Sequence, residues 1–100
     1  MEIINSELRI VLGAYVKEWI NLGNFKEWFA TNVWDLLDSP SPLDRMVVGE
    51  LQIAIAEFDR GDRDAQHVKE ISVGFLFILN AVQHALNSAT EIAKPTEIFI

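Results

Sequence analysis

The chain has 100 residues, half of them apolar, with no cysteine and a net charge of −7 at pH 7. That length suits one domain with a single core, and the composition is that of a globular protein. Without cysteine there are no disulfides and no thiol chemistry, which fits a reducing, cytoplasmic compartment. The charge disfavours direct binding to nucleic acid phosphates or to an anionic membrane surface, and favours a basic protein as partner.

The N-terminal residues show no basic segment followed by a cleavable apolar stretch, so we expect no secretory signal. The longest apolar run extends from Val73 to Leu79. A membrane span needs roughly twenty such residues. We therefore expect this run to be a core segment and the protein not to bind a membrane.

Apolar residues at three- and four-residue steps predict a first helix over residues 6–21, with Ser6 as its N-cap. The residues expected on its buried face are Leu8, Val11, Leu12, Tyr15, Val16 and Trp19. Gly23 is suited to the left-handed residue that follows a helix. Asn24 and Glu27 then form an Asn-x-x-Glu pattern close to a capping box, which predicts that Asn24 caps the second helix.

The second helix places one large side chain away from its apolar stripe. That stripe comprises Phe25, Trp28, Phe29, Val33, Leu36 and Leu37. At about 100° per residue, Trp34 points in nearly the opposite direction, beside Glu27 and Asp38. Such a Trp either packs against a neighbouring helix or the C-terminal tail, or is exposed as the anchor of a binding surface.

Ser41 and Pro42 predict the start of a third helix that runs to about Arg60. Its expected buried face comprises Leu43, Val47, Leu51, Ala54, Ile55 and Phe58. Glu50 and Glu57, seven residues apart, lie on one side of this helix. The favoured interpretation is a solvated helix margin. The alternatives are a carboxylate pair for acid–base chemistry or anchors for basic side chains across an interface.

Asp62 or Asp64 is expected to cap a fourth helix, whose heptad-like apolar spacing continues to about Ala93, shortly before Pro95. At 1.5 Å per residue that helix is about 45 Å long, against about 21 to 28 Å for the earlier helices. It therefore either overhangs the other helices or bends near Gly74.

The C-terminal residues 96–100 are apolar enough that we expect them to fold back on the bundle. Four amphipathic helices with short connections predict an all-α fold, a compact antiparallel four-helix bundle. No linker or internal repeat divides the chain. We expect one domain over residues 1–100.

Motifs for a metal site, a phosphate-binding loop or a hydrolytic nucleophile are missing from the sequence. The two histidines, His67 and His84, are far apart, and the alternating charges of residues 59–64 do not match a calcium loop. We therefore expect no catalytic residue, no metal and no cofactor, and a protein that is not an enzyme.

Acidic residues gather between Asp35 and Asp64, where eight Asp or Glu residues stand against three arginines. Helix capping accounts for Asp44 and for Asp62 or Asp64, but not for the remainder. The residues that we expect to bind a basic partner are Glu27, Trp34, Asp35, Asp38, Glu50, Glu57 and Asp59. The alternative is that the acidic span is only a solvated surface.

Three segments of this span carry a family resemblance. They are Ser41-Pro42-Leu43-Asp44-Arg45, Gly49-Glu50-Leu51 and Ala56-Glu57-Phe58-Asp59-Arg60-Gly61-Asp62. Together they resemble small acidic helical immunity proteins of bacterial toxin systems, the kind that accompany nuclease bacteriocins and contact-dependent inhibition toxins. The resemblance covers about a quarter of the chain and transfers no residue role.

The resemblance implies a helical bundle whose acidic face covers the basic substrate cleft of a nuclease toxin that cuts tRNA or DNA. We therefore expect an inhibitor that binds and neutralises such a toxin. The alternative is a structural or regulatory helical module without a toxin partner, which self-associates through Trp34 and the apolar tail. The oligomeric state is left open.

Overall fold

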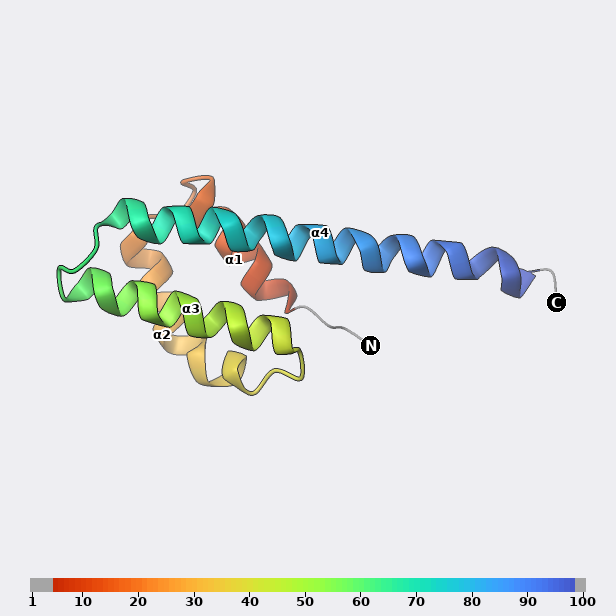
Figure 1. The fold of residues 1–100 in the computed structure, drawn as a ribbon, viewed down its shortest axis with the longest axis horizontal. Coiled ribbons are helices and arrows are strands. Elements are labelled where there is room, and N and C mark those ends of the chain that lie inside the picture. Colours follow the sequence, from red (N-terminus) through yellow and green to blue (C-terminus); the bar gives the residue numbers. More distant parts are fainter. Residues whose placement is uncertain (1–4, 99–100) are drawn as a thin grey trace.

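The structure, a computed structural model, describes the backbone of residues 5–98 and the side chains of residues 5–89. Its elements are α1 (Ser6–Val16), α2 (Leu22–Leu37), α3 (Pro42–Asp59) and α4 (Ala65–Ile98), with no strand among residues 5–98 (Figure 1). The predicted all-α four-helix bundle is confirmed.

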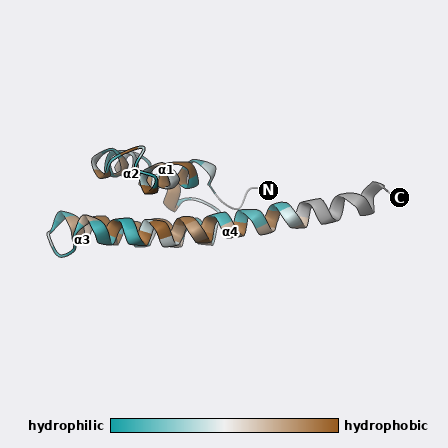
Figure 2. Ribbon diagram, turned by 90° about the horizontal axis from the view of Figure 1, so that it is seen from above, coloured by the Kyte–Doolittle hydropathy of each residue, from teal (hydrophilic) through white to brown (hydrophobic). Residues whose placement is uncertain are grey.

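The helices form two layers. α3 and α4 lie side by side and antiparallel, and α1 and α2 cross them steeply on one side of the pair (Figures 1 and 2). Each helix packs on the next along the chain, and α1 also packs on α4. The opposite side of the α3–α4 layer is covered by no other helix of the described chain (Figure 2).

The core lies between the two layers. Its fully or nearly fully buried side chains are Leu8, Leu12, Tyr15, Phe25, Phe29, Val33, Leu36, Val47, Val48, Leu51, Val68 and Leu79. Tyr15 of α1 stacks on Phe25 of α2, with the ring centroids 4.7 Å apart. The amphipathic periodicity of the first three helices therefore identified most of the core correctly.

The first helix ends earlier than predicted. It stops at Val16 rather than at residue 21, because Glu18 takes a left-handed conformation with φ of 64°. The chain then folds back, and the Trp19 amide donates to the carbonyl of Ala14. This turn leaves Trp19 75 % exposed, so its predicted place on the buried face is wrong.

The second helix begins at Leu22 and is capped by Asn21, not by Asn24. The Asn21 side chain accepts a hydrogen bond from the Asn24 amide at 2.8 Å. The capping-box prediction is therefore wrong, and Gly23 lies in the first turn instead of in a left-handed position. Asn21 rather than Asn24 is the N-cap because the tight turn before Asn21 places its side chain over the free amides at the start of the helix.

The third helix matches its prediction closely. It starts at Pro42 after the cap Ser41 and ends at Asp59. Arg60 is its C-cap, and Gly61 takes the left-handed conformation with φ of 81° that only glycine adopts without strain.

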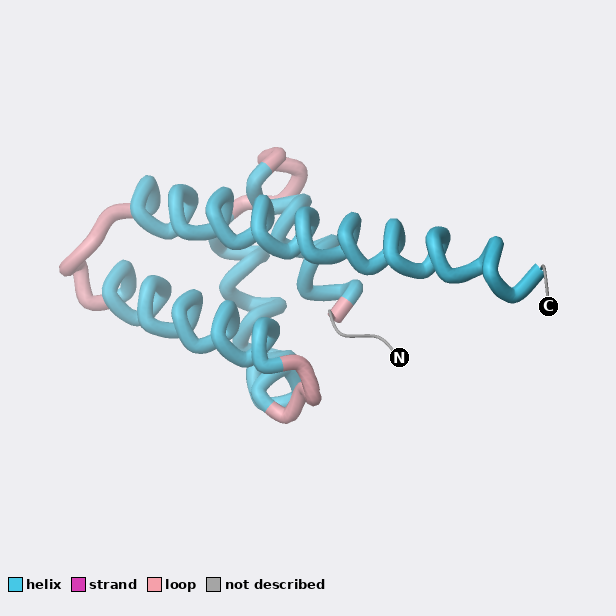
Figure 3. Tube along the Cα trace, turned by 45° about the vertical axis from the view of Figure 1, so that its right-hand side comes forward, coloured by secondary structure: helices cyan, strands magenta, loops and turns pink. Residues whose placement is uncertain are grey.

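The fourth helix overhangs rather than bends. Asp64 caps it by accepting from the His67 amide at 3.0 Å, and the helix continues through Gly74 as one element (Figure 3). It extends well beyond the other helices, which makes the molecule 60 × 26 × 18 Å. The overhang follows from length, since 34 residues span about 51 Å of helix.

The predicted end of this helix before Pro95 is wrong, because the helix runs on to Ile98. Proline removes one helical hydrogen bond, but the amides that follow it can still pair with carbonyls one turn back. Residues 96–98 therefore continue the helix, which points away from the body (Figure 1). The prediction that they fold back is also wrong, and residues 99 and 100 lie outside the described chain.

Candidate protein-binding surface

Trp34 is exposed. It lies on α2 opposite the buried residues Phe25, Phe29 and Leu36, and 72 % of it is accessible to solvent. Of the two positions that the sequence allowed for this side chain, the structure has the solvent-facing one. An exposed Trp offers a large, rigid apolar surface, which is typical of the residues that dominate binding energy in protein interfaces.

Exposed acidic side chains surround this Trp on the same helix. The acidic α2 face, as we define it, comprises Glu27, Thr31, Trp34, Asp35 and Asp38, all exposed. Thr31 is held by a hydrogen bond from its hydroxyl to the Glu27 carbonyl at 3.0 Å. Among residues 5–89, no ion pair engages the carboxylates of this face.

Two of these acids stand where the helix itself disfavours them. Asp35 lies in the last turn of α2 and Asp38 is its C-cap, and no basic residue occupies that turn. The C-terminal end of a helix carries partial negative charge, so a carboxylate there costs roughly 0.3–1 kcal/mol. Helix stability therefore does not explain the placement of Asp35 and Asp38.

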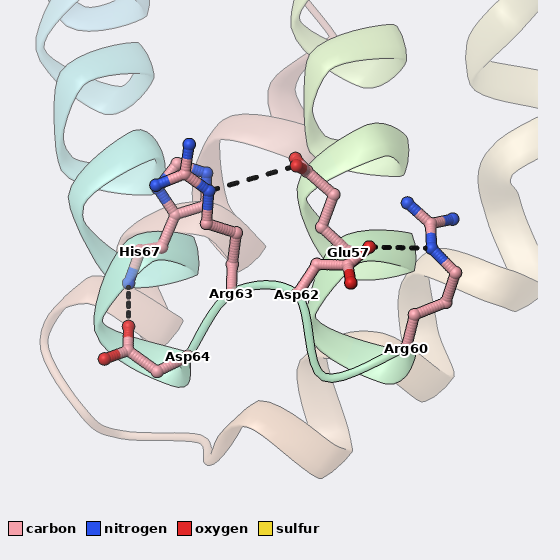
Figure 4. Close-up of polar contacts among 6 residues, drawn as sticks. All are labelled: Glu57, Arg60, Asp62, Arg63, Asp64 and His67. Carbon is pink, nitrogen blue, oxygen red and sulfur yellow. Dashed lines mark hydrogen bonds and ion pairs between the residues drawn. The ribbon is translucent and has the colours of Figure 1, made fainter.

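Two of the other candidate acids form ion pairs within the molecule, and Figure 4 shows that of Glu57. Glu57 on α3 forms an ion pair with Arg63 of the α3–α4 loop, with 3.9 Å between Oε2 and Nε. Asp59 at the end of α3 pairs with Lys26 of α2 and so joins two helices. Both carboxylates are therefore already paired and less available to a partner, although exposed ion pairs of this kind add little to stability.

Glu50 is the remaining candidate, and it stands apart from the acidic α2 face. It is exposed on α3, between the exposed apolar side chains Met46 and Ile53. Glu57 lies two turns further along, roughly 10.5 Å by helical rise. Since Glu57 is already paired with Arg63, the structure offers no support for a catalytic pair.

The acidic α2 face lies away from two surface depressions of the described chain. These depressions, of about 330 and 230 Å³, lie between α1 and α4 and include no residue of this face. Nor does any group of three or more His, Asp or Glu side chains within the described residues suit a metal ion. An exposed, charged surface with one aromatic anchor is suited to a protein partner rather than to a small molecule.

The sequence analysis missed a second exposed surface, on α4. The run from Val73 to Leu79 was expected in the core, yet only Leu79 is fully buried, while Val73, Phe77 and Ile78 are exposed. A helix in a two-layer bundle buries one stripe, whereas this run of six apolar residues and one glycine covers the whole circumference. This excess of apolar residues over one buried stripe was the signal in the sequence for an exposed apolar surface.

The same helix passes a simple test for a membrane span. By length and composition alone, the stretch from Ala65 to Ala89 could cross a bilayer, and only 11 % of its apolar window is buried in the bundle. A single helix of this kind is weak evidence of a membrane protein. It does show how much apolar surface α4 leaves uncovered.

Comparison with known proteins assigns no relative: no protein-family model, no curated protein and no solved structure matches this chain.

Proposed function

We propose that this chain is a non-enzymatic, cytoplasmic protein that binds and neutralises a basic protein through its acidic α2 face. The partner class that suits it best is a bacterial toxin nuclease, so that the chain acts as an immunity protein. One observation carries the proposal: Trp34 is exposed beside acids that have no ion-pair partner among residues 5–89, two of them at a helix end that disfavours negative charge.

The two kinds of side chain contribute differently. A nuclease holds its substrate in a groove lined with basic residues, because the phosphates are negative. The carboxylates of Asp35 and Asp38 would be attracted to the same groove, which speeds encounter and sets the orientation of the complex. Trp34 would be desolvated at the centre of the contact and slow dissociation. Nucleic acid and this chain would then compete for one cleft.

Binding kinetics at low and high salt test this division of roles. The partner for the measurement is a toxin nuclease domain encoded beside the gene for this chain, and a genome without one would itself count against the proposal. Asp35→Lys and Asp38→Lys should slow association, and the loss should shrink as salt rises, because salt screens exposed charges. Trp34→Ala should mainly speed dissociation, by about tenfold or more, with little dependence on salt.

Glu70→Lys is the matched control, since Glu70 is an exposed acid on α4, in the other layer. It makes the same change in net charge and should leave both rate constants nearly unchanged. If all three charge reversals act equally, the acidic α2 face is only part of a uniformly negative surface. If Trp34→Ala also has no effect, the proposed binding surface is wrong.

A further inference from the structure

The middle of α4 is free of formal charge. No Asp, Glu, Lys or Arg occurs in the twenty residues from Ile71 to Thr90, in a chain that is 23 % charged. His84 is the one titratable side chain in that stretch. The core-facing side of the stretch packs on α1 and α3 through residues such as Ser72 and Leu79, which are fully buried.

The outward side of this stretch is apolar and uncovered. Phe77 is 74 % exposed and Val73 is 47 % exposed, and no other helix covers the side of the α3–α4 layer that lies away from α1 and α2 (Figure 2). Met46 and Ile53 of the neighbouring α3 are exposed as well. The layer therefore has one face buried in the bundle and an open face with several large apolar side chains.

The outward side also has a regular order of small and large residues. Gly74, Ala81 and Ser88 follow one another at seven-residue spacing, the repeat of a helix–helix seam. The bulky Phe77 lies between the first two of them and the small Ala85 between the last two. Phe77 is thus the one bulky residue of this series, and small residues occupy its other positions, including those that lead into the overhang.

We propose that a second copy of this chain docks here, its α4 antiparallel to the first about a two-fold axis at Ala81. In that register Phe77 of each copy shares a layer with Ala85 of the other, and Gly74 shares a layer with Ser88. In the Phe77–Ala85 layers a large side chain thus meets a small one, which avoids overpacking, while the Gly74–Ser88 layers pair two small residues and let the helices approach closely. A parallel pairing would instead set Phe77 of one chain against Phe77 of the other, and Ala85 against Ala85, which leaves that layer underfilled.

Charge favours a second copy at this place. Two molecules of net charge −7 repel one another over most of their surfaces, and like charges brought together cost several kcal/mol. The stretch from Ile71 to Thr90 lets them approach without such contacts. The antiparallel register also lays the overhanging part of each α4 along the open face of the other copy, in the self-complementary way of two-fold dimers.

A lipid bilayer suits the same surface less well. Inserting α4 would strip Val68 and Leu79 from the core. It would also take polar side chains out of water, among them Gln83 and Asn87, which bond to each other at 3.0 Å on the helix surface. The proposed dimer leaves these polar groups at its margin. It is independent of the proposed toxin binding, since the acidic α2 face lies in the other layer.

Sedimentation of the full chain over a wide concentration range tests the dimer. The wild type should sediment as a dimer, and Ala81→Glu should raise the dissociation constant by about tenfold or more, because it places two like charges at the axis. Ala30→Glu is the matched control: Ala30 is an exposed alanine on α2, and Ala and Glu are both good helix formers. It should change the constant by less than about twofold.

A residue swap tests the register. Phe77→Ala and Ala85→Phe should each weaken the dimer, the first by leaving a gap and the second by overpacking. The double variant should regain most of the wild-type affinity, since each of these two layers again pairs one phenylalanine with one alanine. Additive losses in the double variant would rule out the antiparallel register.

Two results would overturn the proposal altogether. One is a wild-type chain that stays monomeric at every concentration. The other is a chain that floats with phosphatidylcholine vesicles and loses this property in Ala81→Glu, which would assign the surface to a bilayer. Helical circular dichroism spectra of all variants establish that they are folded when compared.

Discussion

At the scale of the residue, Asp44 shows that an acid in the first turn of a helix can make a tertiary contact instead of a cap. It is almost fully buried, and its Oδ2 accepts from the Asn5 amide at 2.7 Å and from the Ser39 hydroxyl at 3.1 Å. Its own amide donates to Ser41 at the cap of α3. Capping was the role expected for Asp44, but Ser41 is the N-cap of α3, and the Asp44 carboxylate instead ties the start of α1 to the α2–α3 connection.

Tyr15 yields a prediction about pH. Burial raises the pKa of its phenol above 10.0, because the charged phenolate loses its hydration. The fold therefore favours the neutral form. Its contribution to stability is full below pH 10 and declines as pH rises through the raised pKa.

The measurement is simple because Tyr15 is the only tyrosine in the chain. Ultraviolet absorbance of the phenolate should appear at higher pH in the native protein than in the same chain in denaturant. Identical titration curves in the two conditions would show that the phenol is hydrated, and the stacking of Tyr15 on Phe25 would be in doubt.

At the scale of the element, α3 shows how sharply one helix separates buried from exposed positions. Leu51 is fully buried, while Ile53, two residues on, is 56 % exposed. Leu51→Ala should lower the free energy of unfolding by about 2–5 kcal/mol, through lost burial and a cavity. Ile53→Ala should cost less than about 1 kcal/mol.

Urea unfolding of the two variants makes this comparison, because both substitutions shorten an aliphatic side chain in the same helix. The Ala81→Glu background keeps the open face of the α3–α4 layer free of a second copy. Equal losses at both positions would mean that the buried face of α3 is assigned incorrectly.

At the scale of the whole molecule, the overhang of α4 sets the shape. The radius of gyration over Cα atoms is 15.9 Å, whereas a compact domain of this length has about 13 Å. X-ray scattering from the Ala81→Glu variant should therefore give a value near 16 Å for the monomer. A value near 13 Å would show that α4 bends back near Gly74, the alternative that the sequence allowed.

The sequence by itself determined the number of helices, the bounds of α3 and most of the core. These depend on local signals, the helical spacing of apolar residues and the Ser-Pro start of α3, which act within a few residues. The acidic excess and the unusual place of Trp34 on α2 were visible for the same reason.

Only the tertiary structure decided which side chains stay exposed and which acids are engaged. The left-handed turn at Glu18 ended α1 early and exposed Trp19, and the approach of Lys26 and Arg63 engaged Asp59 and Glu57. In the run from Val73 to Leu79, the sequence could not separate buried from exposed positions, because every side of the helix carries a hydrophobic residue. Its buried side is set by where α1 and α3 lie, and helix positions are long-range packing that local periodicity does not encode.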